Sequence, residues 1–238
     1  MKNYVGFFLL FIFLGFGCAA ITKERYVLPD TYYAPLEFAY PFPFEKVWAN
    51  TLKKLPDLEV ILENLNKEAK TITLSFVASS PEKYVDCGAI NLQTDTASLF
   101  QNTFKGAQSE ARFYISTGDI APQETTRKVK LSGKINIHFA SEGTSQTKVT
   151  VKTFYDLDIQ LEGERYSHMN HGIISTPVFN PYAINTQITF YAGQEGRGNK
   201  TISPGGLRYV FDSEGEMVCR SKFVLERIIF DAIGKPTP

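Results

Sequence analysis

The sequence predicts an α+β protein in which an antiparallel sheet carries one helix near each end of the domain. Apolar residues recur at helical spacing over residues 44–55, and a second helical stripe follows residue 221. Between them, apolar and polar residues alternate strictly along residues 127–140 and again along 149–161. Helical spacing places side chains on one face of a helix, whereas strict alternation buries one face of a strand and leaves the other in water.

The first helix is predicted at residues 44–55. Pro43 can occupy its first position, and Pro56 followed by Asp57 ends it. The apolar stripe consists of Phe44, Val47, Trp48, Thr51, Leu52 and Leu55. The spacing places Trp48 in the core, so we expect it to be a packing residue rather than part of a ligand site.

Most of the remaining elements are predicted to be strands. The long hairpin of residues 127–140 and 149–161, joined by a turn at 141–146, has the clearest pattern. Shorter strands are predicted at 58–64 and 71–78 (a hairpin), 84–88, 111–116, 183–192, 208–211 and 216–219. The stretches near 89–126 and 163–206 are predicted to be mainly long loops, because they lack a sustained period and the second is rich in glycine.

The second helix is predicted to close the domain. Ser221 can cap it, and Gly234 followed by Pro236 ends it. Its apolar stripe consists of Leu225, Ile228, Ile229, Ala232 and Ile233. This stripe predicts that the helix packs on the sheet.

The N-terminus carries an apolar run, Val5 to Phe16, of signal-peptide length and too short to span a bilayer as a helix. It leads into Gly17-Cys18-Ala19-Ala20, which resembles a bacterial lipoprotein signal. The resemblance implies removal of residues 1–17 and a diacylglycerol on the Cys18 thiol. An ordinary signal peptide cleaved after Ala20, or a retained apolar anchor, is the alternative.

Lipidation at Cys18 would make residues 18–30 a tether and residues 31–238 a single domain. Ala19 in place of Asp after the cysteine favours the outer membrane under the sorting rule that the resemblance implies. The expected location is therefore the cell envelope, with the protein held by lipid at the outer membrane and facing the periplasm.

Cys87 and Cys219 are the two cysteines that remain when Cys18 carries lipid. In an oxidising compartment two such thiols most simply form a disulfide with each other. The alternative is a pair of separate buried thiols. Neither belongs to a C-x-x-C pattern, so we expect no redox or zinc role for them.

Composition and motifs exclude several classes of function. Basic and acidic residues are equal in number, 25 each, which argues against a nucleic-acid surface. His168 and His171 lack a third clear metal ligand, and residues 193–201 lack the helix that a phosphate loop requires. No G-x-S-x-G nucleophile elbow is present. We therefore expect no enzymatic activity, no metal and no cofactor.

The order of elements resembles the helix-grip arrangement, in which an antiparallel sheet wraps around a helix. Within that class, Val47-Trp48, residues 84–88 and the Cys219-Arg220-Ser221 entry into the last helix resemble uncharacterised proteobacterial lipoproteins distantly similar to BamC, an accessory lipoprotein of outer-membrane protein assembly. The resemblance implies the fold and the disulfide rather than an activity.

Two functions fit these observations. The first is a non-catalytic scaffold or accessory module that contacts an envelope protein partner through a sheet edge and loops. The second is a carrier of an apolar, lipid-like ligand in a cavity between the sheet and the C-terminal helix, since such a cavity could be lined by the many aromatic residues.

Overall fold

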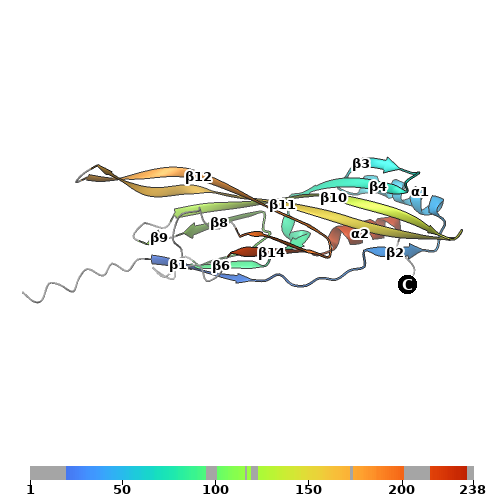
Figure 1. The fold of residues 1–238 in the computed structure, drawn as a ribbon, viewed down its shortest axis with the longest axis horizontal. Coiled ribbons are helices and arrows are strands. Elements are labelled where there is room, and N and C mark those ends of the chain that lie inside the picture. Colours follow the sequence, from blue (N-terminus) through green and yellow to red (C-terminus); the bar gives the residue numbers. More distant parts are fainter. Residues whose placement is uncertain are drawn as a thin grey trace, which may run out of the picture.

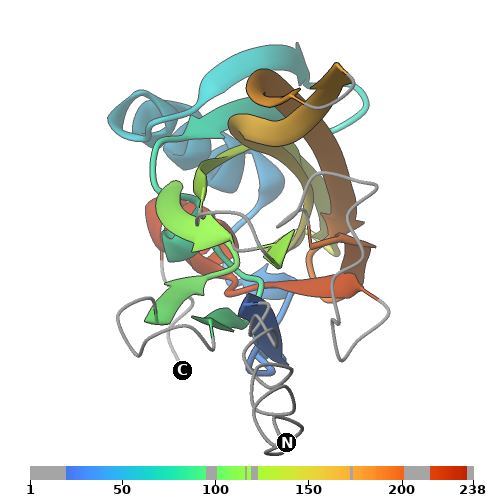
Figure 2. The same cartoon turned by 90° about the vertical axis from the view of Figure 1, so that its left-hand side faces the viewer.

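The computed structural model describes residues 20–94, 101–115, 117–118, 123–171, 174–200 and 215–234. These residues form an elongated molecule, which is seen across its long axis in Figure 1 and from the end where β1 begins in Figure 2. It consists mostly of antiparallel sheet with two short helices, so the predicted α+β class is confirmed. None of its helices is both long and apolar enough to cross a membrane, within the described residues.

One long sheet runs the length of the molecule. Its strands are β12 (Ile174–Tyr191), β11 (Gln146–His171), β10 (Gln123–Glu142), β4 (Thr71–Ala78) and β3 (Ile61–Asn66) in that order, with β2 (Glu37–Tyr40) on β11 and β8 (Glu110–Ile115) on β10. The predicted long hairpin is therefore confirmed as β10–β11, and Val129 pairs with Ile159 within it. Both side chains are buried, so the inward face is the apolar one that the alternation predicted.

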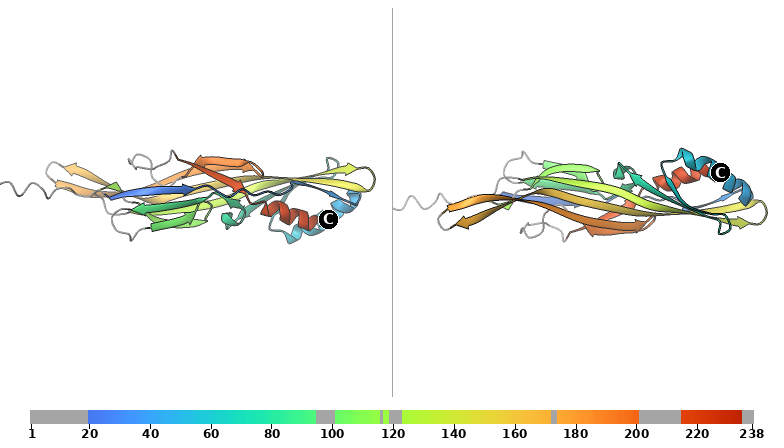
Figure 3. Two further views of the ribbon diagram at one scale, coloured as in Figure 1. Left: turned by 90° about the horizontal axis from the view of Figure 1, so that it is seen from below. Right: turned by 90° about the horizontal axis from the view of Figure 1, so that it is seen from above.

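Two different layers cover the inward face of this sheet. Helices α1 (Phe44–Lys54) and α2 (Val224–Ile233) cover one half. Two small sheets cover the other half, one formed by β7 (Gln101–Lys105), β6 (Ala89–Thr94), β1 (Ala20–Val27) and β9 (Thr117–Gly118), the other by β13 (Glu195–Asn199), β14 (Glu216–Ser221) and β5 (Val85–Asp86). In the left view of Figure 3, β1 and β14 lie over one half and α2 over the other.

Helix α1 forms as predicted and buries its apolar stripe. Trp48 is buried against Phe139 of β10, with the two ring centroids 5.2 Å apart. Pro43 precedes the first helical residue rather than occupying it, and a short 3₁₀ turn, Leu55–Asp57, follows the helix. Trp48 is thus a core residue, as the spacing predicted.

Helix α2 begins later than predicted. Ser221 does not cap it. Instead the Ser221 hydroxyl accepts a hydrogen bond from the backbone N–H of Phe223 at 2.9 Å, and Phe223 adopts a left-handed conformation with φ 56° before the helix starts at Val224. Ile228, which the stripe predicted to be buried, is 39% exposed, whereas the buried face includes Glu226 and Phe230. Gly234 ends the helix as predicted.

The stretches near 89–126 and 163–206 contain far more strand than expected. The strands predicted at 111–116 and 183–192 are confirmed as β8 and the end of β12. In addition, β6, β7, β9 and the start of β10 occupy much of the first stretch, and extensions of β11 and β12 together with β13 occupy much of the second. The strands of the first stretch are short and present polar residues outward, as in Asn91 and Thr103, so their apolar residues are too sparse to stand out in the sequence. A short 3₁₀ turn, Pro81–Lys83, precedes β5.

The predicted tether is also wrong where the structure describes it. Residues Ala20–Val27 form β1, in which Ala20 and Ile21 pair with β9 and the remaining residues pair with β6. The mixture of charges that suggested a tether is accommodated because Glu24 is buried in an ion pair with Lys200, with Oε1 and Nζ 2.8 Å apart. The first predicted hairpin is confirmed as β3–β4, with β4 at the predicted residues and β3 beginning at Ile61, three residues later than expected. The strand expected at 208–211 lies outside the described residues.

The disulfide between Cys87 and Cys219 is present, with the sulfur atoms 2.04 Å apart. It joins the residue after β5 to β14, which are neighbouring strands of one small sheet. We call the half of the molecule that the two small sheets cover the sandwich half, and the half that α1 and α2 cover the helical half. The chain is crowded here: a Cβ on Gly88, whose φ is +71°, would stand 2.0 Å from the carbonyl oxygen of Val27. Only glycine avoids this clash and readily adopts that conformation.

We predict that removing the disulfide lowers the free energy of unfolding by about 4 to 5 kcal/mol, because the bond closes a long loop in the unfolded chain. The two cysteines are 132 positions apart. Cys87→Ser and Cys219→Ser should lower stability equally, and the double variant no further. Urea unfolding of the three variants and the wild type measures this. Additive losses in the double variant would contradict a shared bond.

Candidate functional site

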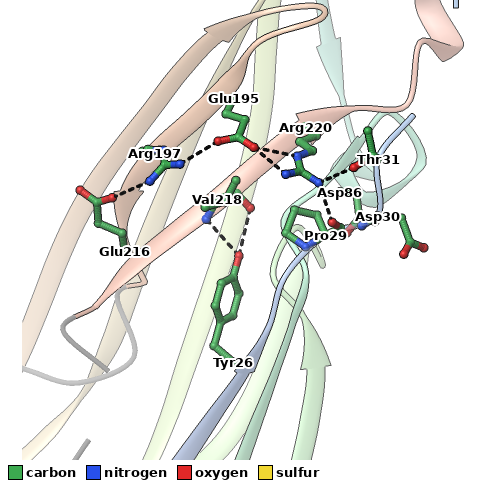
Figure 4. A network of polar contacts seen from close by, with 10 residues as sticks. All are labelled: Tyr26, Pro29, Asp30, Thr31, Asp86, Glu195, Arg197, Glu216, Val218 and Arg220. Atoms are coloured by element: carbon green, nitrogen blue, oxygen red, sulfur yellow. Dashed lines mark hydrogen bonds and ion pairs between the residues drawn. The ribbon is translucent and has the colours of Figure 1, made fainter. Parts of the chain in front are cut away.

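A polar junction lies where the two small sheets meet the segment that connects β1 to β2 (Figure 4). Arg220 of β14 donates through Nε and Nη2 to Oε1 of Glu195, at 3.1 and 2.5 Å. Its Nη1 donates to the carbonyl oxygen of Pro29 at 2.9 Å and to Oγ1 of Thr31 at 2.8 Å. One side chain therefore fastens β13, β14 and the segment that connects β1 to β2.

Two further side chains strengthen this junction. Asp86 of β5 accepts hydrogen bonds from the backbone N–H of Asp30 at 3.3 Å and from the Tyr32 hydroxyl at 3.0 Å. The Tyr26 hydroxyl accepts from the N–H of Val218 at 3.0 Å. Desolvation, together with the hydrogen bond to Asp86, raises the pKa of Tyr32 to about 12. Tyr32 therefore stays protonated and remains a donor across the physiological pH range.

A cleft of about 480 Å³ opens beside this junction, and we call it the junction cleft. Its lining includes Tyr32, Tyr33, Gln194, Arg220, Ser221 and Phe223. Tyr33 is 89% exposed. Tyrosine and arginine are typical of protein-binding surfaces, because they combine contact area with hydrogen bonding. The cleft is therefore equipped to contact a partner, whereas its lining offers no pairing of a nucleophile with a base.

A buried acid lies behind Ser221. The Tyr155 hydroxyl donates to the Glu226 carboxylate, 3.0 Å from Oε1, and accepts from the Ser221 hydroxyl at 3.2 Å. Burial raises the pKa of Glu226 and, more strongly, that of Tyr155. All three side chains are buried. The arrangement therefore fixes α2 on the sheet through satisfied polar contacts and gives bulk solvent almost no access to the acid.

We predict that Glu226 makes the protein less stable as pH rises. Because folding raises the pKa of this carboxyl above its ordinary value of 4.5, the folded state binds the proton more tightly than the unfolded state. Stability is then greatest below the unfolded pKa and is lost as pH rises through the folded pKa. Glu226→Gln keeps the shape of the protonated acid and cannot ionise.

Thermal unfolding between about pH 4 and pH 8 measures this difference. The melting temperature of Glu226→Gln, relative to the wild type, should increase with pH. Glu63→Gln is a suitable control, since Glu63 is a partly exposed acid on β3 paired with Lys134. Parallel curves for the wild type and Glu226→Gln would contradict the assigned direction.

The outer strand β3 forms a second candidate site, which we call the β3 edge and define as Ile61, Leu62 and Leu65. Leu62 pairs with buried Leu74 of β4, and Leu65 pairs with buried Ile72. The two leucines therefore continue the inward apolar face beyond the last covered strand. Ile61, Leu62 and Leu65 remain 65%, 50% and 43% exposed. Apolar side chains on an outer strand favour pairing with another chain.

The residues singled out from sequence fall into three groups. The structure brings Cys87 and Cys219 together as predicted. Cys18 lies outside the described residues, as do the side chains of His168 and His171. In the remaining chain, no group of three potential metal-ligating side chains is found where residues are described. Part of the glycine-rich stretch after residue 193 is strand β13 rather than loop.

Sequence reasoning missed four features: Arg220, Glu226, the β3 edge and Arg127 of β10. Glu226 occupies the helical position four residues before Phe230, and Arg127 is in phase with Val129 and Leu131 on the inward face. Their spacing could have indicated burial, but a stripe built from apolar residues alone leaves out charged ones. Arg220 follows Cys219 and gives no comparable signal.

No protein-family model, no curated protein and no solved structure matches this chain. The function must therefore be argued from the geometry.

Proposed function

We propose that this protein is a membrane-anchored envelope lipoprotein that acts as a non-catalytic scaffold or accessory module in the periplasm. The observation that supports this function best is the β3 edge. Leu62 and Leu65 continue the inward apolar face beyond the elements that cover it, and both remain about half exposed. This part of the core is therefore incomplete and suited to a protein partner.

The chemistry of the β3 edge favours a strand or an amphipathic helix as the partner's contact. The strand offers backbone groups along its outer side, since β3 is the last strand on its side of the sheet. It contains no proline and a single charged residue, Glu63, which pairs with Lys134 at 3.1 Å. An added strand would extend the hydrogen-bonded ladder, and its side chains would cover Leu62 and Leu65.

The position of β1 supports an orientation for the anchored protein. β1 begins at Ala20, two residues after Cys18. A lipid on Cys18 would therefore hold the end of the molecule where β1 begins close to the membrane. The β3 edge lies toward the opposite end (Figure 1). Through β4 and β10, β3 lies level with Thr150–Phe154 of β11. At about 3.3 Å per residue, the stretch of β11 from Phe154 to its end at His171 spans roughly 55 Å, so the edge would be displayed well away from the bilayer.

We also propose the helix-grip-like arrangement for the helical half. Its support is that α2 packs along β11, with Phe230 edge-on to Phe38 of β2 at 4.6 Å between ring centroids. Tyr155, Ile229 and Phe230 are buried at this interface. No observation among the described residues favours the carrier alternative between the sheet and α2.

We predict that a photo-reactive amino acid in place of Leu62 forms a discrete cross-link to one envelope protein in intact cells. The same amino acid in place of Lys152, an exposed residue of the central strand β11, should form none. Leu65→Lys in the chain that carries the probe should lower the yield about tenfold, since a charge would oppose burial of the edge. Electrophoresis and mass spectrometry of the products measure this.

The proposed function fails if position 62 gives no product, or if positions 62 and 152 give the same products. Leu65→Lys is expected to fold, because Leu65 is already substantially exposed. Its melting temperature should therefore stay close to that of the wild type. This control separates a lost contact from a lost fold.

A further inference from the structure

Arg127 is the largest fully buried side chain in the described chain. It extends from the inward face of β10 in the sandwich half, where its neighbours across the sheet are Ala111 of β8 and Leu161 of β11. Its guanidinium lies 5.9 Å from the centre of the Phe104 ring. Phe104 in turn stacks on Phe113. A permanently charged group therefore lies among apolar side chains.

The protein gives this guanidinium very little to bind. Nη2 donates to the sulfur of Met217 at 3.7 Å, and thioether sulfur is a weak acceptor. Nε and Nη1 have no hydrogen-bond acceptor among the described residues. Burying this charge is costly, because one weak acceptor and the face of the Phe104 ring replace only a small part of the hydration that was lost. Burial lowers the pKa of Arg127 to about 10, so the group is still charged at neutral pH.

The small sheet that faces Arg127 carries a second hydrogen-bond donor without an acceptor. Asn102 lies two residues before Phe104 on β7, so both side chains project from the same face of that strand. The amide nitrogen of Asn102 is buried and has no acceptor among the described residues. Two donors thus lie on facing layers, and both require an acceptor that these residues do not supply.

A buried acid on the same small sheet as Asn102 already has a partner. Glu24 of β1 pairs across β6 with Leu92, which pairs in turn with Asn102 of β7. Its carboxylate forms the ion pair with Lys200 at 2.8 Å. The charges of this pair cancel, so Glu24 does not neutralise Arg127.

We propose that the sandwich half binds an amphipathic anion, with the anionic head of the ligand between Arg127 and Asn102 and its apolar body among Phe104, Phe113 and Met217. A carboxylate or phosphate would supply acceptors to both donors. The apolar neighbours would accept a hydrocarbon body and offer little to a polar one. This site is separate from the β3 edge and from α2, and it goes beyond the proposed scaffold function.

The first experiment asks whether the protein carries such a molecule. The full chain is purified from membranes in mild detergent and denatured, and its organic extract is analysed by mass spectrometry. We expect a stoichiometric single-tailed carboxylate or phosphate compound, which the mass assigns to one source or the other. Arg127→Met should retain roughly 10- to 100-fold less of it, as expected for the loss of a charge-assisted contact.

The second experiment titrates protein stripped of lipid with oleate and, separately, with oleyl alcohol. Wild type should bind oleate roughly 10- to 100-fold more tightly than the alcohol, and Arg127→Met should remove this preference. Arg112→Met is the matched control, because Arg112 is an exposed arginine on neighbouring β8. It should leave the preference unchanged.

Stability separates the ligand site from a purely structural role. In stripped protein, Arg127→Met should raise the melting temperature, because it removes a buried charge that lacks an acceptor. The proposal is overturned if the extract is empty and stripped wild type binds neither compound. Equal affinity for oleate and oleyl alcohol, or a lower melting temperature for stripped Arg127→Met, would also overturn it. None of these results depends on the cross-link at position 62.

Discussion

The inward face of the β10–β11 hairpin is apolar along most of its length, and the rest of the structure follows from the need to cover it. Phe139 and Val149 near the turn are buried, and so are Val129 and Ile159 far along the same two strands. No single helix or small sheet is long enough to shield this face. Two helices and two small sheets share the task, so the chain needs a firm join between the two covers.

The join combines a covalent bond with a small number of polar contacts. Cys87–Cys219 fixes β14 beside β5 within one small sheet, and Arg220 attaches the segment between β1 and β2 to that sheet. Tyr155 then links the two covers, because its hydroxyl accepts from Ser221 at the end of β14 and donates to Glu226 of α2. Each of these polar groups has partners, so their burial costs little and favours one arrangement. Arg127 differs because its neighbours cannot satisfy it, and that contrast makes it a candidate binding group rather than a packing residue.

The sequence predicted those features that local periodicity controls. Trp48 at helical spacing and Val129 in strict alternation were placed correctly in the core, and the two cysteines outside the signal paired as expected. Strands β6 and β7 were missed because pairing partners far along the chain, such as β1 for β6, stabilise short segments that have little pattern of their own. Tertiary pairing of this kind cannot be seen in a local window.

The candidate sites were harder to predict for the same reason. Leu62 follows the same inward pattern as Leu74, and only the extent of the covering layer determines that one is exposed and the other buried. Arg127 and Glu226 are in phase with apolar neighbours. A pattern built from apolar residues alone leaves them out because they are charged, so it does not predict their burial. Whether a buried charge finds a partner depends on side chains from other elements, which the sequence does not place.

The central claim is that the long sheet separates a membrane-held end from a distant docking edge. Neutron reflectometry tests it most directly, using the mature protein purified from cells and inserted through its N-terminus into a supported bilayer. The account predicts a protein layer roughly 80 Å deep, close to the length of β11, and no retained layer for Cys18→Ser. A layer of roughly 20 to 30 Å, the depth of two stacked sheets lying flat, or full retention of Cys18→Ser would contradict it.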